Sequence, residues 1–166
     1  MSIRINRAPV LTLWAAIVAE RLGFEHDEAL TLGRALAGLT AHAKGVRLGI
    51  FEPSSREEIQ ERRQQLGQDE QMHVRLMGRD IAVVRTADGL RAIEKDKPAK
   101  PAAVVKYLAS KFGEDLASVR DAMAALADSL PPAELHRRAF GLCERFRPSV
   151  PEGEQGWGPR ACWTWA

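Results

Sequence analysis

The sequence contains little cysteine and almost no excess charge, and each of these shortages excludes a class of protein. Its 166 residues include 2 cysteines, too few for a disulfide framework, and 4 histidines that lie far apart along the chain. The formal net charge is only +2, from 24 basic and 22 acidic side chains, which argues against a large electrostatic surface for nucleic acid or an anionic membrane. The histidines and cysteines make no spaced ligand set. We therefore expect no metal, no cofactor and only a local basic surface.

The chain also lacks an apolar run long enough to cross a membrane. Its most apolar segment, 8–19, falls short of the roughly 20 residues that a span needs. Basic residues precede this segment, as in a secretory signal peptide, but cleavage after Ala19 would place Ile17 at the −3 position, where a small residue is needed. The helical pattern continues to Gly23, so we favour a buried helix. We expect a cytoplasmic protein with no membrane association, in agreement with the unpaired cysteines.

The remaining composition is that of a folded globular domain, with 45% hydrophobic and 28% charged residues. Apolar residues at helical spacing predict six helices, over 9–22, 27–44, 55–66, 102–112, 116–130 and 133–147. Between 72 and 93 the apolar period changes to 2, which predicts three short strands joined by two-residue turns at Gly78-Arg79 and Asp88-Gly89. The expected fold class is α+β, a mostly helical domain of about six helices with a three-stranded antiparallel meander in the middle.

Four segments follow from this pattern, and we expect them to form one domain overall. They are an N-terminal helical segment (1–70), the meander (71–93), a C-terminal three-helix segment (94–147) and a tail rich in glycine, proline and tryptophan (148–166). Trp14 and Leu36 are expected in the core because they lie on nearly uncharged apolar stripes. The tail tryptophans, Trp157, Trp163 and Trp165, are expected to pack on the helices rather than remain exposed.

The helix over 27–44 carries an unbroken row of small residues at i, i+4 spacing. Its members are Ala29, Gly33, Ala37 and Ala41. Glycine inside a helix costs about 1 kcal/mol relative to alanine, so close packing is needed to offset Gly33. The row is interpreted either as packing within the chain, which we favour, or as a self-association face.

Basic residues are concentrated in the meander and its connector, where 71–101 holds seven of them against four acidic residues. They are Arg75, Arg79, Arg85, Arg91, Lys95, Lys97 and Lys100. Such residues either contact phosphates or acidic partners, or protect short edge strands from pairing with other chains. A two-residue turn at Asp88-Gly89 would pair Arg85 with Ala92 and place Arg85 and Arg91 on opposite faces, whereas a three-residue loop would place both on one face.

No catalytic constellation is found in the sequence. His136 and Cys143 are predicted on one helix about two turns apart, too far for direct contact, and a buried thiol is the favoured interpretation of Cys143. We expect no catalytic residue and no enzyme activity. The predicted function is a non-enzymatic binding or regulatory module that contacts nucleic acid or an acidic protein through the basic meander. The alternative is a structural protein that assembles into a homo-oligomer through the small-residue row and the tryptophan-rich tail.

Overall fold

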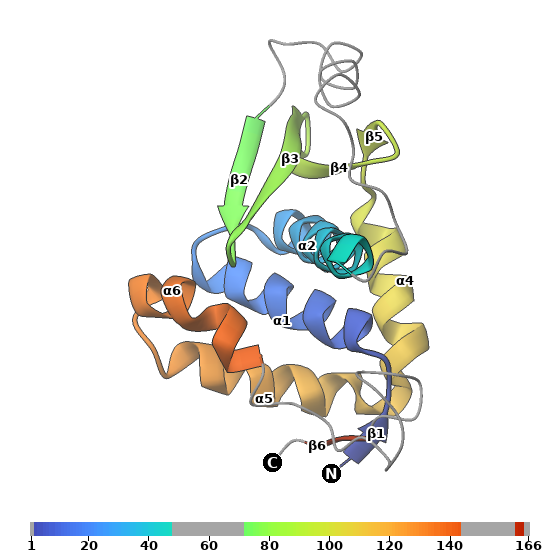
Figure 1. The fold of residues 1–166 in the computed structure, drawn as a ribbon, viewed down its shortest axis with the longest axis vertical. Coiled ribbons are helices and arrows are strands. Elements are labelled where there is room, and N and C mark those ends of the chain that lie inside the picture. Colours follow the sequence, from blue (N-terminus) through green and yellow to red (C-terminus); the bar gives the residue numbers. More distant parts are fainter. Residues whose placement is uncertain (1, 48–71, 144–161, 165–166) are drawn as a thin grey trace.

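The computed structural model of the chain describes residues 2–47, 72–143 and 162–164. In Figure 1, α1 lies at the centre, with α2 and then a sheet above it, α5 and α6 below it and α4 along one side. The helices are α1 (Arg7–Arg21), α2 (His26–Arg47), α4 (Pro101–Phe112), α5 (Leu116–Asp128) and α6 (Pro132–Cys143), with a 3-10 turn, Gly113–Asp115, before α5. The fold is α+β and mostly helical, as expected. The described residues hold fewer than the six expected helices, and the helix expected over 55–66 lies outside them.

Helix α1 is the centre of the core. Every residue from Pro9 to Ala19 is buried, because the helix is surrounded by other elements and its sequence there has Thr12 as the one polar residue. The buried-helix interpretation of this segment is therefore confirmed. The expected core position of Trp14 is also confirmed: its side chain is fully buried and its Nε1 donates a hydrogen bond to the carbonyl oxygen of Ala139 at 2.9 Å. None of the described helices combines the length and apolar character that a membrane span requires.

Helix α2 packs closely on α1 through its small-residue row. A Cβ on Gly33 would lie 2.5 Å from the backbone oxygen of Thr12 and 2.9 Å from the backbone nitrogen of Ala16, so only glycine fits at this crossing. Ala29 and Ala37 are also buried, and the exposed member of the row is Ala41. The row is thus used within the chain, as favoured from the sequence, and most of it is inaccessible to a second copy.

The sheet contains four strands, one more than expected. It is antiparallel in the order β2 (Met72–Leu76), β3 (Arg79–Thr86), β4 (Gly89–Glu94) and β5 (Lys97–Pro98). The extra strand, β5, lies in a segment that the sequence marks as a connector. Lys95 and Asp96 make the turn before it with φ values of 49° and 64°, and positive φ at both central residues suits a two-residue hairpin turn. Neither residue is glycine, so the sequence carries no signal for this turn.

The other two hairpin turns each lie one residue earlier than expected. The closing pairs are Leu76 with Arg79 and Thr86 with Gly89, so the loops are Met77-Gly78 and Ala87-Asp88. The expected turn positions are therefore wrong, and the pairs of the second hairpin shift with them: Arg85 lies opposite Leu90, not Ala92. The expected shared face of Val74, Leu76, Ile81 and Val83 is retained, and all but the half-buried Val74 are fully buried against the helices.

The N- and C-terminal helices contribute to the same hydrophobic core. Its largest buried side chains come from both halves of the chain, including Trp14 and Leu36 on α1 and α2 and Phe112, Met123 and Leu135 on α4, α5 and α6. The core position of Leu36 is therefore confirmed together with that of Trp14. One cluster of buried residues also includes the inner face of the sheet.

The two ends of the chain pair with each other below the helices. Strand β1 (Ser2–Arg4) is antiparallel to β6 (Cys162–Thr164), with Ile3 opposite Trp163. This pairing brings the backbone of part of the tail next to the start of α1. The prediction that the tail tryptophan side chains pack on the helices concerns Trp157 and Trp165, which lie outside the described residues, and a Trp163 side chain that is also not described.

Candidate binding sites

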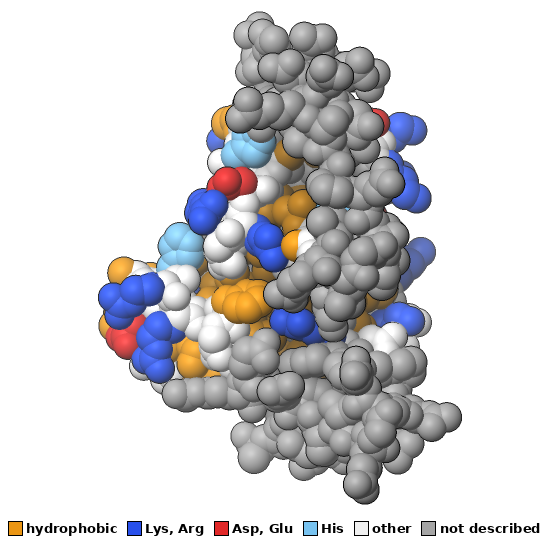
Figure 2. All heavy atoms as spheres, viewed as in Figure 1, with side chains coloured by type: hydrophobic (Ala, Val, Ile, Leu, Met, Phe, Trp, Pro, Cys, Tyr) orange, Lys and Arg blue, Asp and Glu red, His pale blue; other side chains and the backbone are white. Residues whose placement is uncertain are grey.

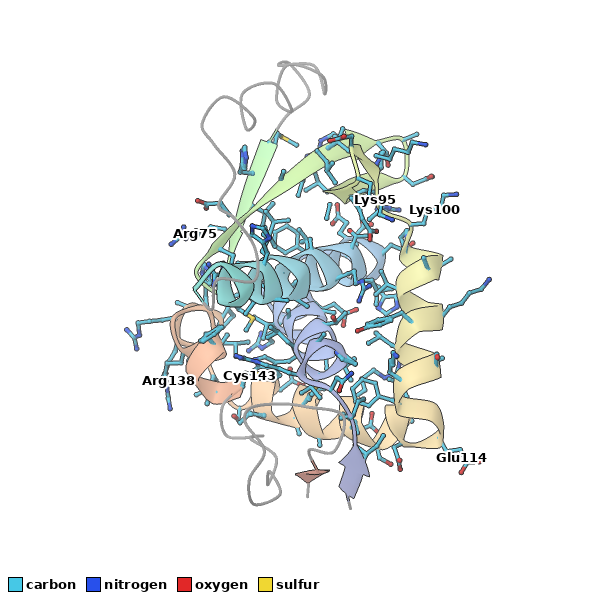
Figure 3. The ribbon with its side chains drawn as sticks, turned by 45° about the vertical axis from the view of Figure 1, so that its right-hand side comes forward. Arg75, Lys95, Lys100, Glu114, Arg138 and Cys143 are labelled. Atoms are coloured by element: carbon cyan, nitrogen blue, oxygen red, sulfur yellow. The ribbon has the colours of Figure 1, made fainter. Side chains whose placement is uncertain are left out.

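The fold separates the sequence-predicted basic residues into groups instead of forming one patch. Arg75 and Arg79 lie at the β2–β3 hairpin, and Arg85 lies near the end of β3. Lys95 and Lys97 lie on the β4–β5 hairpin, and Lys100 directly precedes α4. Figure 3 shows Arg75 on one side of the molecule and Lys95 and Lys100 on the other.

Arg91 belongs to none of these exposed groups. Its residue is only 7% exposed, and its guanidinium donates hydrogen bonds to the carbonyl oxygens of Leu90 at 2.8 Å and Asp88 at 3.3 Å. A guanidinium nitrogen also lies 3.9 Å from a carboxylate oxygen of Asp27, at the start of α2. Arg91 therefore holds the β3–β4 hairpin against α2, and we leave it out of the candidate contact surface.

The first turns of α2 take the place of a neighbouring strand along part of β4. The Glu28 carboxylate accepts a hydrogen bond from the backbone N–H of Leu90 at 2.8 Å, and the Thr31 hydroxyl accepts one from the N–H of Ala92 at 3.1 Å. These side chains satisfy backbone donors that would otherwise lie unpaired at a sheet edge. Glu28 and Thr31 thus fix the distance between α2 and the sheet, and sequence patterns did not identify either residue.

The hydrogen bond from Leu90, followed by one from the N–H of Glu25, lowers the pKa of Glu28 below its ordinary value of 4.5. Partial burial of the carboxyl group opposes this shift, and the positive charges of Arg91 and Arg85 add to it. The ionised form of Glu28 is therefore the form that the fold favours.

We predict that Glu28→Gln lowers the free energy of unfolding by about 1 kcal/mol at pH 7, because a neutral amide accepts these hydrogen bonds more weakly. The pKa of Glu28 is lower in the folded state than in the unfolded state. The extra free energy of unfolding of the wild type over Glu28→Gln is therefore present above pH 4.5, and it is lost as the pH falls through the folded-state pKa. Urea unfolding of both proteins from pH 7 to pH 3 measures the difference. Glu114→Gln, at an exposed carboxylate on the 3-10 turn, is the control. A wild-type advantage that does not change with pH would contradict the role of Glu28.

A cavity of about 590 Å³ lies between α2 and the sheet. Its α2 wall consists largely of small residues, and its opposite wall comes from β2, β3, β4 and the turn after β4. The apolar lining includes Ala35, Gly38, Leu39, Ala82 and Ile93. Figure 2 shows hydrophobic side chains at the surface in the middle of the molecule, beside polar side chains. The volume is in the range typical of small-molecule sites.

Few polar side chains reach this cavity, and they differ in how far their charges are compensated. The Arg34 guanidinium carbon lies 3.9 Å from the centre of the Tyr107 ring, a stacking contact that holds the side chain in place. The Asp80 carboxylate is paired with Arg75 at 3.2 Å. His73, Glu94 and Lys95, which are exposed, and Thr31, which is buried, complete the polar lining. Arg34 and Lys95 make no ion pair with a described carboxylate, and Arg34 is the better placed of the two to bind an anion because its stacking on Tyr107 holds it in position.

The described residues provide no assembled metal centre. Within 2–47, 72–143 and 162–164, no three histidine, cysteine, aspartate or glutamate side chains are grouped so that they could hold a metal ion. Cys143 is buried, with 1% of its surface exposed, which confirms the prediction of a buried thiol, while His136 on the same helix is exposed. Cys143 therefore has the environment of a core residue.

Two candidate sites remain: the exposed lysines around β5 and the cavity beside α2. The first follows from the charge pattern of the sequence, whereas the second is formed by residues of α2 and the sheet that are far apart in the chain. Comparison with models of protein families, with curated proteins and with solved structures finds no match to this chain.

Proposed function

We propose that the protein is a non-enzymatic binding module that contacts nucleic acid through an edge formed by Lys95, Lys97 and Lys100, called here the lysine edge. All three side chains are exposed, and none makes an ion pair with a described carboxylate. Figure 2 shows Lys and Arg side chains along the side of the molecule where Figure 1 has β5 and α4. Lysines that make no ion pair and lie on a projecting hairpin are accessible to phosphates.

The backbone holds the lysine edge in a defined shape, and this supports the proposal. The turn at Lys95 and Asp96 pairs Glu94 with Lys97, and the N–H of Ala99 donates to the carbonyl oxygen of Ala92 at 2.7 Å. A hairpin fixed in this way presents its charges without a further cost for ordering the backbone on binding. Glu94 and Asp96 lie on the same hairpin and reduce its net charge, so the binding is expected to be weak and independent of base sequence.

The expected dissociation constant for duplex or single-stranded DNA is about 10⁻⁴ to 10⁻⁶ M at physiological salt. Lys97→Glu should weaken binding at low salt and reduce the slope of log K against log salt by about 1 or more, because it removes one phosphate contact and adds a repulsive charge. Fluorescence anisotropy with labelled DNA at low and physiological salt measures both quantities. Lys111→Glu, an exposed charge reversal near the other end of α4, is the matched control.

The proposal fails if no binding is detected at low salt, or if Lys111→Glu weakens binding as much as Lys97→Glu. Sedimentation velocity at two concentrations, with and without DNA, should give one species of unchanged size in the absence of DNA. Concentration-dependent assembly without DNA binding would favour a structural role instead. A cytoplasmic location, suggested by the low cysteine content of the sequence, forms part of the proposal.

A further inference from the structure

The cavity beside α2 combines an open apolar space with two cations, Arg34 and Lys95, that make no ion pair with a described carboxylate, and Arg34 is the one held in place by an aromatic ring. We propose that it is a binding site for a small amphipathic monocarboxylate, with the apolar part of the ligand in the cavity and its carboxylate at Arg34. This function is separate from DNA binding at the lysine edge, although Lys95 borders both sites.

The cavity exists because the α2 residues that face the sheet here are small. Thr31 holds α2 to β4 through its hydrogen bond with Ala92, and the α2 residues that follow on this side, including Ala35 and Gly38, are too small to reach the sheet. A Cβ placed on Gly38 would meet no heavy atom within 4 Å, apart from its chain neighbours and its own helix backbone. Protein interiors are close-packed, so a space of about 590 Å³ at this contact suits an occupant of small-molecule size.

The lining of the cavity is largely apolar. Leu39 borders the cavity and remains 39% exposed, one of the few large hydrophobic side chains with this exposure in the described residues. Ile93 on β4 and Ala82 on β3 add apolar surface from the opposite wall. An apolar ligand part would cover these groups and remove their surface from water.

The charged groups around the cavity favour an anionic ligand group at Arg34. Arg34 is half-buried and stacked on Tyr107, so little side-chain entropy is lost when its guanidinium binds an anion. The negative charge of Asp80 is compensated by Arg75, and the carboxylate of Glu94, which also lines the cavity, is exposed and screened by solvent. A planar carboxylate matches the two-pronged geometry of a guanidinium, which favours a carboxylate over other monoanions.

Four probes separate the contributions to binding by the full chain: octanoate, acetate, 1-octanol and octylamine. Isothermal titration calorimetry should show saturable binding of octanoate, weaker binding of octanol, and no binding of acetate or octylamine. Tighter binding of octylamine than of octanoate would assign the site to a cation and overturn the proposal. The absence of saturable octanoate binding up to about 10 mM would also overturn it.

Gly38→Phe tests the location, because the new side chain starts in open space and fills the cavity. We expect it to weaken octanoate binding at least about tenfold, whereas Gly38→Ala, which makes the same backbone change without filling the space, should retain binding within about threefold. Far-UV circular dichroism and the melting temperature check that both variants fold. Unchanged octanoate binding by folded Gly38→Phe would overturn the assignment.

Arg34→Gln tests the role of the cation and remains informative if Gly38→Phe does not fold. It should weaken octanoate binding about five- to tenfold and leave octanol binding unchanged, and Arg34→Lys should restore part of the loss. Lys111→Gln is the control for a charge removed elsewhere. Equal loss of octanoate and octanol affinity would indicate a structural effect and contradict the carboxylate contact. DNA binding should be unchanged in Arg34→Gln and Gly38→Phe, which keeps this test distinct from that of the lysine edge.

Discussion

Replacement of Trp14 by alanine is expected to lower the free energy of unfolding by about 3 to 5 kcal/mol, the usual cost of removing a buried aromatic side chain from a core. Trp14 is 0% exposed at the centre of α1, with α2 on one side and α5 and α6 on the other. Its loss also leaves the carbonyl oxygen of Ala139 without the indole N–H that donates to it at 2.9 Å. A single-domain protein has about 5 to 15 kcal/mol of stability, so this substitution should remove at least about a fifth of the total.

Two further variants separate packing from hydrogen bonding at this position. Trp14→Phe keeps much of the apolar volume and removes the N–H, so it should cost clearly less than Trp14→Ala. Val105→Ala, at a helix position that is 48% exposed, should change stability by less than about 1 kcal/mol. Urea unfolding monitored by circular dichroism measures all three. A Trp14→Ala midpoint equal to that of wild type would contradict the central position of α1.

The helices were predictable from the sequence because their signals are local. Pro9 near the start of α1 and Gly23 after its end, with φ of 111°, bracket a run that is buried on all sides. Gly113 ends α4 in the same way. The apolar spacing in α5 and α6 depends only on one face of each helix meeting the core. These patterns can be recognised in the sequence without knowing which other element covers that face.

The turn positions were not predictable to the residue, since side chains outside the Gly-containing dipeptides decide them. Thr86 closes the β3–β4 turn: its hydroxyl accepts a hydrogen bond from the N–H of Asp88 at 3.3 Å and donates to the carbonyl oxygen of Gly89 at 2.8 Å. Gly89, with φ of 115°, therefore follows the loop instead of lying in it. In the β2–β3 turn, Met77 takes a positive φ that its residue type does not suggest.

The two candidate sites also differ in how far the sequence could predict them. The lysine edge could be anticipated because its residues are close in sequence. The burial of Arg91 could not, since it depends on Asp27 and Glu28 from the start of α2, more than 60 residues away in the chain. The cavity also had no sequence signal: Gly38 and Ala35 suggest helix packing, and only the separation of α2 from the sheet leaves space beside them.

The two glycines inside α2 should respond in opposite directions to the same substitution. Gly33→Ala places a Cβ 2.5 Å from the backbone oxygen of Thr12, a contact that requires α1 and α2 to separate. We expect a net loss of about 1 to 3 kcal/mol, and a larger loss for Gly33→Val. Gly38→Ala meets nothing and removes the helix penalty of glycine, so it should increase stability by about 0.5 to 1 kcal/mol.

Because both substitutions add one methyl group to the same helix, their difference isolates the contact between α1 and α2 from the intrinsic preference of the helix. Thermal and urea unfolding of the two variants and of the double variant measure it. The effects should be additive in the double variant, since Gly33 faces α1 and Gly38 lines the cavity next to the sheet. Stabilisation by Gly33→Ala would show that the two helices do not cross as closely as the backbone contact at Thr12 requires, and the small-residue row would then be available to a second copy of the chain.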